Sequence, residues 1–120
     1  MRAVIDERRG GRGVPASALE RLFDREAKRH GFPVGEAEAP LPGRTAGPER
    51  VDRLYRRARL IIEIDGRRWH TRVADFDRDH QRELDALAAG YRTARVTAWI
   101  LKYDAAGTFD RLRQILAVAA

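Results

Sequence analysis

Residues 51–65 read VDRLYRRARLIIEID, and this stretch decides the fold. Its two apolar runs, at 51–55 and 58–65, are rich in the β-branched and aromatic residues that favour strands. Arg56 and Arg57 lie between the runs and predict a two-residue turn, which makes the pair a β-hairpin. The rest of the chain must then supply a cover for the apolar side of this hairpin.

One side of the predicted hairpin carries three acids. Side chains two residues apart in a strand share a face, so Glu63 and Asp65 project together. With a two-residue turn, Asp52 lies opposite Ile61 on that face and about 7 Å from Glu63 at Cβ. Three such carboxylates repel one another unless protons or a cation offset their charge, and Mg²⁺ (or Mn²⁺) suits oxygen ligands of this kind. The alternative is an ordinary solvent-facing strand side with surface acids.

Hydrophobic periodicity around the hairpin predicts helices and further strands. Ser17 and Glu20 have the spacing of a capping box at the start of a first helix, and Leu84 and Leu87 indicate another helix. The expected elements, in chain order, are a helix at 17–31, an edge strand within 34–41, the hairpin, a helix at 74–89, a strand with its continuation at 91–100 and a helix at 107–118. This order predicts an α/β domain of the α+β type, with a central mixed β-sheet of about four strands flanked by helices.

The chain has 120 residues, the size of one domain. Residues 1–14 are rich in arginine and glycine and are expected to form a flexible arm, which leaves 15–120 as the folded domain. There is no run of about 18 apolar residues and no signal-peptide pattern, so we expect no membrane span, and the cytoplasm is the default location. The absence of cysteine excludes disulfides and thiolate metal sites.

The formal net charge is +6, and Lys28 and Lys102 are the only lysines. A basic balance dominated by arginine fits a polyanionic partner, with nucleic acid as the leading candidate. Codon bias in a GC-rich genome would give the same enrichment in arginine, alanine and glycine. Charge alone therefore does not decide the partner.

Several motifs in register resemble a known family. The matching segments are 51–52, 58–66, Trp69-His70, Asp79 with Arg82, and 90–92. They resemble the bacterial domain family related to the very-short-patch mismatch-repair endonucleases, within the PD-(D/E)XK superfamily of restriction-endonuclease-like proteins. The resemblance covers residues 15–116. It implies a restriction-endonuclease-like fold and Mg²⁺-dependent hydrolysis of DNA phosphodiester bonds, as an endonuclease of a repair or mobile-element system.

The resemblance also implies roles for single residues. Asp52 matches the aspartate of the superfamily motif and Glu63 its second acid, so both would bind the metal, whereas Asp65 stands where a lysine is usual. His70 matches a histidine of the repair enzymes, and Asp65 or His70 would orient or deprotonate the attacking water. Glu20 resembles the acid that many members contribute from the first helix. The capping box with Ser17 is the competing role for Glu20, and loop closure is the competing role for His70.

Nucleic-acid contacts are expected next to these acids. Arg82, on the helix after the hairpin, would offset charge on the phosphate, and Trp69 would stack on a base. Arg82 could instead pair with Asp79 and Glu83 on its own helix, and Trp69 could pack on the hairpin. Arginines that could rim the site for a phosphodiester substrate are Arg67, Arg68 and Arg72.

Three departures from the family pattern bear on activity. Asp65 in place of lysine removes the usual positive group beside the water, and Arg53 follows Asp52 where an apolar residue is expected. The structural zinc of the repair enzymes cannot be present in cysteine-bound form. Two alternatives to a nuclease therefore stand: a catalytically inactive nucleic-acid-binding module of the same fold, and a protein-interaction domain such as a toxin-antitoxin partner. Cutting both strands of a duplex would call for a homodimer.

Overall fold

The computed structural model describes residues 16–43, 49–66 and 73–119. Within these ranges, the elements in chain order are α1 (Ala16–Arg29), β1 (Glu36–Pro40), β2 (Arg50–Tyr55), β3 (Leu60–Asp65), α2 (Val73–Ala88), β4 (Arg92–Thr97), α3 (Ala98–Tyr103) and α4 (Ala105–Ala119). No helix of the described part is long and apolar enough to cross a membrane.

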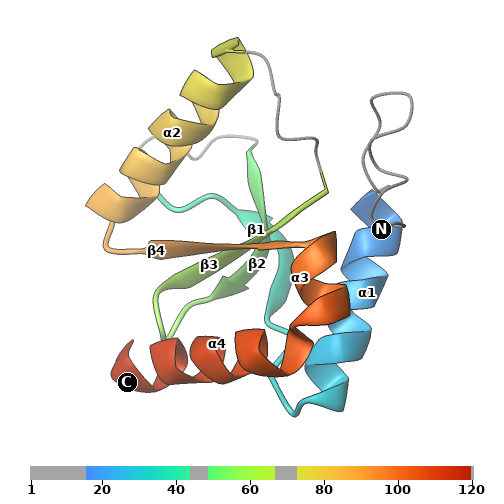
Figure 1. Ribbon diagram of the computed structural model, residues 1–120. Helices are drawn as coiled ribbons and strands as arrows, with labels where there is room; N and C mark the ends of the chain where they lie inside the picture. The colour runs from blue at the N-terminus through green and yellow to red at the C-terminus, as the bar shows by residue number, and fades with distance from the viewer. Residues whose placement is uncertain (1–15, 44–48, 67–72, 120) are drawn as a thin grey trace.

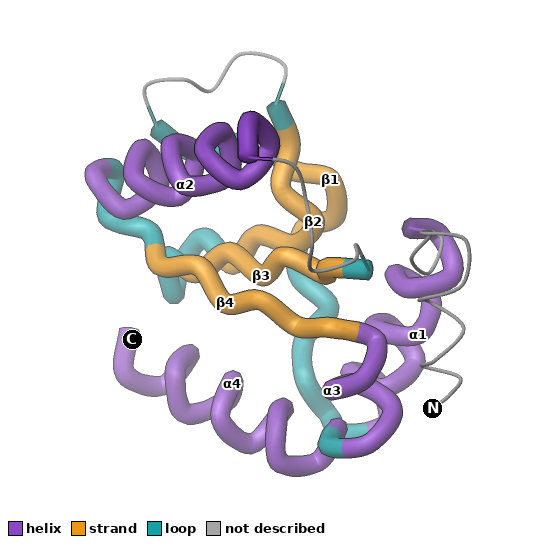
Figure 2. The backbone as a smooth tube through the Cα atoms, turned by 45° about the horizontal axis from the view of Figure 1, so that its top comes forward, coloured by secondary structure: helices purple, strands orange, loops and turns teal. Residues whose placement is uncertain are grey.

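The strands form one mixed sheet in the order β1-β2-β3-β4. β2 runs antiparallel to both β1 and β3, and β4 runs parallel to β3. A parallel pair needs a crossover, which α2 provides over one face of the sheet, whereas α1, α3 and α4 lie on the other face (Figure 1 and Figure 2). The predicted α+β architecture, a mixed four-stranded sheet flanked by helices, is confirmed.

The hairpin of β2 and β3 has a longer turn than the sequence suggested. Tyr55 pairs with Leu60, so four residues, 56–59, form the connection, and the prediction of a two-residue turn was wrong. Tight two-residue turns favour positive φ at both central positions, which arginine disfavours. The longer turn needs this conformation only at Arg59, where φ is 53°. The pairing of the two strands is therefore shifted by two residues from the predicted register, and such a shift leaves every side chain on its predicted face. One residue beyond the pair Arg53 and Ile62, Asp52 lies directly across from Glu63, where Ile61 was predicted.

The main core lies between the sheet and the helices α1, α3 and α4. Its centre is aromatic, because the Phe109 ring lies 5.7 Å from that of Phe23 and 5.3 Å from that of Phe32. Ile62 of β3 and Leu101 of α3 close the core from either side. This packing fixes α1 beside the sheet and so places the side chains that α1 directs toward β1 and β2.

The face of α2 that meets the sheet is partly charged. Ala86 is buried there, and Arg82 and Glu83 are half-buried beside it. The helix itself was predicted, but Leu84 and Leu87, which indicated it, lie on its outer side and are 64% and 60% exposed. The layer between α2 and the sheet is therefore more polar than the main core.

Two predicted boundaries were wrong. The strand expected at 91–100 ends at Thr97, because the Thr97 side chain accepts a hydrogen bond from the backbone N–H of Ile100 (3.2 Å) and caps α3. The first helix begins at Ala16, one residue before Ser17, so Ser17 is not its N-cap. The Glu20 carboxylate contacts Arg53 instead of closing a capping box.

Candidate metal centre

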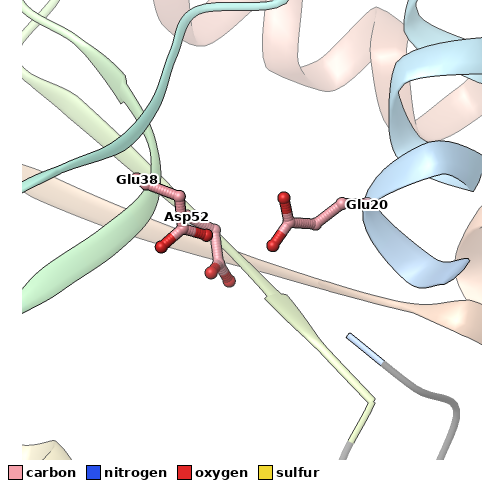
Figure 3. Close-up of side chains that lie close together, drawn as sticks. All are labelled: Glu20, Glu38 and Asp52. Atoms are coloured by element: carbon pink, nitrogen blue, oxygen red, sulfur yellow. The ribbon is translucent and has the colours of Figure 1, made fainter. Parts of the chain in front are cut away.

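Three carboxylates from three elements converge beside the sheet. Glu20 comes from α1, Glu38 from β1 and Asp52 from β2, and each offers an oxygen within 4.8 Å of the other two (Figure 3). We call these residues the acidic cluster. Glu20 and Asp52 are half-buried, and Glu38 is exposed, so the cluster lies at the surface with access for a ligand.

Sheet pairing accounts for the two strand residues of the cluster. Ala37 pairs with Arg53 and Ala39 with Val51, so Glu38 lies across from Asp52. Glu38 has φ 50°, a left-handed backbone conformation that costs a residue with a side chain on the order of 1–3 kcal/mol. Such conformations persist where the surrounding structure holds them, and they concentrate at binding sites.

Arg53 lies beneath the acidic cluster and is 2% exposed. Its Nη2 donates to Asp24 Oδ1 (2.8 Å), and its Nη1 donates to the backbone oxygen of Asp52 (2.7 Å) and lies 3.4 Å from Glu20 Oε1. Its guanidinium also covers the Phe23 ring at 5.5 Å. Burial alone would lower the pKa of Arg53, but the hydrogen bond and charge of Asp24, with those of Glu20, raise it. The arginine after Asp52 is thus a buried counter-charge, where an apolar residue was expected.

Within the cluster, the surroundings of Glu38 disfavour its ionised form. Loss of solvent around its carboxyl, the hydrogen bond with Glu20 and the negative charges of Glu20 and Asp52 raise the pKa of Glu38. Arg53 opposes this effect without cancelling it. Like charges that cannot separate are offset either by protons or by a bound cation. The cluster therefore has the charge imbalance that a divalent ion would relieve.

Glu63 stands on the other side of Asp52, toward α2. Its side chain is 18% exposed, and burial, with the negative charge of Asp52, raises its pKa to about 7. Asp52 Oδ2 also accepts a hydrogen bond from the backbone N–H of Ile64 (2.7 Å). Asp52 thus links the acidic cluster to Glu63, and Glu63 is adjacent to the cluster without being part of it.

Asp65, the third predicted metal ligand, is half-buried at the end of β3 and pairs with Thr97 of β4 in the sheet. It is not part of the acidic cluster. The structure therefore brings together Asp52 and Glu20 from the predicted set, with Glu63 next to them.

Arg82 ties α2 to the sheet beside Glu63. Its Nε lies 2.7 Å from Glu49 Oε1, its Nη2 donates to the backbone oxygen of Arg50 (2.7 Å), and the same atom is 3.7 Å from Glu63 Oε2. The positive charge of Arg82 lowers the pKa of Glu63 but does not outweigh burial and Asp52. The guanidinium is 23% exposed and lies within reach of an anion that approaches Glu63.

The alternative partners of Arg82 on its own helix are realised only in part. Arg82 Nη1 lies 4.0 Å from Asp79 Oδ1, at the limit of an ion pair. Glu83 pairs with Arg95 of β4. Arg82 and Glu83 are thus paired mainly with residues outside their own helix.

Five predicted residues lie outside the described residues: Arg67, Arg68, Trp69, His70 and Arg72. Their expected roles in proton transfer, stacking and phosphate binding stay predictions. Glu38 was not among the predicted residues. The edge strand expected at 34–41 contains it, and antiparallel pairing of that strand with the hairpin was the signal that could have found it.

No protein-family model, no curated protein and no solved structure matches the chain. Its function is therefore inferred from the geometry of the site and from the sequence resemblance.

Proposed function

We propose that this chain is a divalent-metal-dependent nuclease domain of the restriction-endonuclease type that hydrolyses phosphodiester bonds in DNA. The observation that carries the proposal is the acidic cluster, in which carboxylates from α1, β1 and β2 approach within 4.8 Å of one another. The resemblance of the hairpin to the PD-(D/E)XK superfamily agrees with it, since Asp52, Glu63 and Glu20 all lie at or beside the cluster.

The donor set fits Mg²⁺ or Mn²⁺. All the candidate ligands are carboxylate oxygens, which hard divalent cations prefer. Burial, and then the neighbouring carboxylates Glu20 and Asp52, raise the pKa of Glu38, and a cation beside it would oppose both effects. When bound, such an ion polarises a phosphoryl oxygen and activates water for attack on phosphorus. Glu20, Glu38 and Asp52 would hold the ion, and Arg53 would fix Glu20 from below.

Arg82 and Glu63 flank the proposed reaction centre. Arg82 would attract the phosphate, because its guanidinium is partly exposed beside Glu63. Glu63 would supply a further oxygen ligand from the opposite side of Asp52. Cleavage of both strands of a duplex at one position would then use two copies of the chain.

Replacement of Asp52 or Glu20 tests the proposal. We expect Asp52→Asn and Glu20→Gln each to lower Mn²⁺-dependent cleavage of a labelled DNA by at least about 10- to 100-fold, the range found for loss of a group that only supports a metal ligand. Asp77→Asn, an exposed acid on α2, is the matched control and should leave cleavage unchanged. Cleavage that survives both replacements would rule the proposal out.

The non-catalytic alternative is favoured by one observation, the aspartate at position 65 where the superfamily has lysine. Titration calorimetry with Mn²⁺ separates the two functions. A nuclease requires Mn²⁺ binding that Asp52→Asn weakens, together with cleavage. DNA binding with neither metal binding nor cleavage would support the non-catalytic module.

A further inference from the structure

Two aromatic side chains lie at the surface on α3. Trp99 and Tyr103 are 53% and 57% exposed, although Ala98 and Leu101 of the same short helix are buried. The two residues are one helical turn apart, and their ring centroids are 5.3 Å apart with the planes tilted by 45°. Two adjacent exposed aromatic rings form an apolar surface on which a flat ligand can stack.

A groove between α1 and α3 adjoins Tyr103, and Trp99 lies beside it through its ring contact with Tyr103. It has a volume of about 440 Å³, and Tyr103 forms part of its wall. The side chains that line it from α1 include Arg25, Glu26 and Arg29, and Lys102 contributes from α3. The groove thus combines an aromatic edge with cationic sides.

The charge that the groove presents to solvent is positive. Arg25 and Arg29 are 71% and 72% exposed, whereas Glu26, which pairs with both, is 9% exposed and lies beneath them. Lys102 is exposed and makes no ion pair within the described part of the chain. Such a surface complements phosphates, because the cations face outward and the acid is covered.

The second acid that lines the groove also has a cationic partner. Asp104 lines the groove next to Tyr103, but its Oδ2 lies 3.4 Å from Nη1 of Arg111. On the outer side of α1, Arg21 and Lys28 are exposed and extend the positive surface away from the groove. Positive charge therefore continues around α1 from the groove toward the flank that carries Glu20.

We propose that the groove between α1 and α3 binds a single-stranded segment of nucleic acid, with bases stacked on Trp99 and Tyr103 and phosphates bound by Arg25, Arg29 and Lys102. Unpaired strands are the matching class, since only their bases offer free faces to aromatic side chains, whereas duplex bases are already stacked. The inference extends the proposed function by naming a strand with unpaired bases as the preferred substrate.

Binding measured in EDTA tests this inference separately from cleavage. The probe is a fluorescein-labelled twelve-nucleotide oligothymidine, compared by anisotropy at low salt with a labelled duplex of the same length. We expect tighter binding of the single strand, and we expect Trp99→Ala and Tyr103→Ala each to weaken it by about 5- to 100-fold, the range of one lost stacking contact. Leu84→Ala, an equally exposed apolar side chain on α2, and Arg57→Ala, an exposed arginine of the β2–β3 turn, are the controls and should bind like the parent.

A spectroscopic readout tests stacking directly. The chain has 2 tryptophans, so Trp69→Phe leaves Trp99 as the only one, and its emission should be quenched by oligothymidine. The inference would be overturned if Trp99→Ala bound the oligothymidine as well as the parent does, or if binding caused no quenching. It would also be overturned if the protein bound no single strand at low salt, and a protein partner would then be the remaining occupant of this surface. If the parent protein bound the single strand through Trp99 but showed no metal-dependent cleavage, the proposed nuclease function would be contradicted and this inference would stand.

Discussion

Arg53 shows how one residue changes the character of the site. A buried arginine is costly to desolvate, and here Asp24, Glu20 and the backbone oxygen of Asp52 compensate that cost. The same contacts hold the Glu20 side chain on the flank of α1 that faces β1 and β2. Arg53 is therefore both part of the fold and the base of the proposed metal centre.

Burial of Glu63 should make the free energy of unfolding depend on pH. Its pKa rises from 4.5 in the unfolded reference to about 7 in the fold, so the folded state holds the proton more tightly. The stability that this proton confers is complete below about pH 4.5 and is lost as the pH rises through about 7. At about 1.4 kcal/mol per pKa unit, the chain should lose about 3–4 kcal/mol of unfolding free energy across this window relative to Glu63→Gln. Urea denaturation of both proteins at several pH values measures this difference.

A difference between the two proteins that does not change with pH would contradict this account of Glu63. Added Mg²⁺ provides a further check, because a cation beside Asp52 would stabilise the ionised form of Glu63. The pH-dependent gap between the two proteins should then narrow.

At the scale of elements, β1 depends on a glycine that precedes it. Gly35 has φ +83°, and a Cβ at this position would lie 2.6 Å from Cζ of Tyr55. The Tyr55 hydroxyl lies within hydrogen-bond distance of two backbone oxygens that can accept its proton, those of Pro33 (2.8 Å) and Val34 (2.9 Å). Tyr55 and Gly35 together hold the entry to β1, and β1 carries Glu38.

Gly35→Ala should therefore destabilise the fold more than a glycine change without a close neighbour. Gly31 is the matched control, since it has φ +68° and nothing within 4 Å of an added Cβ. We expect Gly31→Ala to cost about 1 kcal/mol from backbone strain alone, and Gly35→Ala to cost at least about 2 kcal/mol. Denaturant unfolding of both variants checks this, and equal losses would show that the Tyr55 contact yields at little cost.

At the scale of the whole molecule, charge is distributed unevenly over the surface. The net charge is +6, yet the acidic cluster and Glu63 gather on one side of α1, and exposed cations gather on its outer side and along the groove. A polyanion would therefore be attracted by the basic surface of α1 and would reach the acidic cluster once a cation has neutralised it.

The salt dependence of binding follows from this distribution. If Arg25, Arg29 and Lys102 each neutralise one phosphate of a single strand, the logarithm of the binding constant should fall with the logarithm of salt concentration with a slope of about −2. This corresponds to roughly a 20-fold loss between about 50 and 200 mM salt. Anisotropy titrations at several salt concentrations measure the slope, and Lys102→Ala should make it shallower by about 0.7. A slope near zero would exclude phosphate contacts by these residues.

Local patterns predicted the elements well where periodicity was strong. The strand-forming apolar runs of the hairpin, and the hydrophobic periodicity of residues 17–31, indicated two strands and a helix that are all present. The length of the turn was predicted incorrectly, because a two-residue turn favours positive φ at both central positions, which Arg56 and Arg57 disfavour. The face of Asp52 and Glu63 was still correct, since an error of two residues does not change a strand's sides.

The sequence by itself determined the α+β class, the strands of the hairpin and the shared face of Asp52 and Glu63, because these follow from short-range periodicity and backbone sterics. Only the tertiary structure decided that Glu38 joins Glu20 and Asp52, that Arg53 is buried among acids, and that Trp99 remains exposed. These outcomes depend on how α1, β1 and α3 pack against the sheet. That packing is decided by contacts between segments distant in the chain, which no local pattern records.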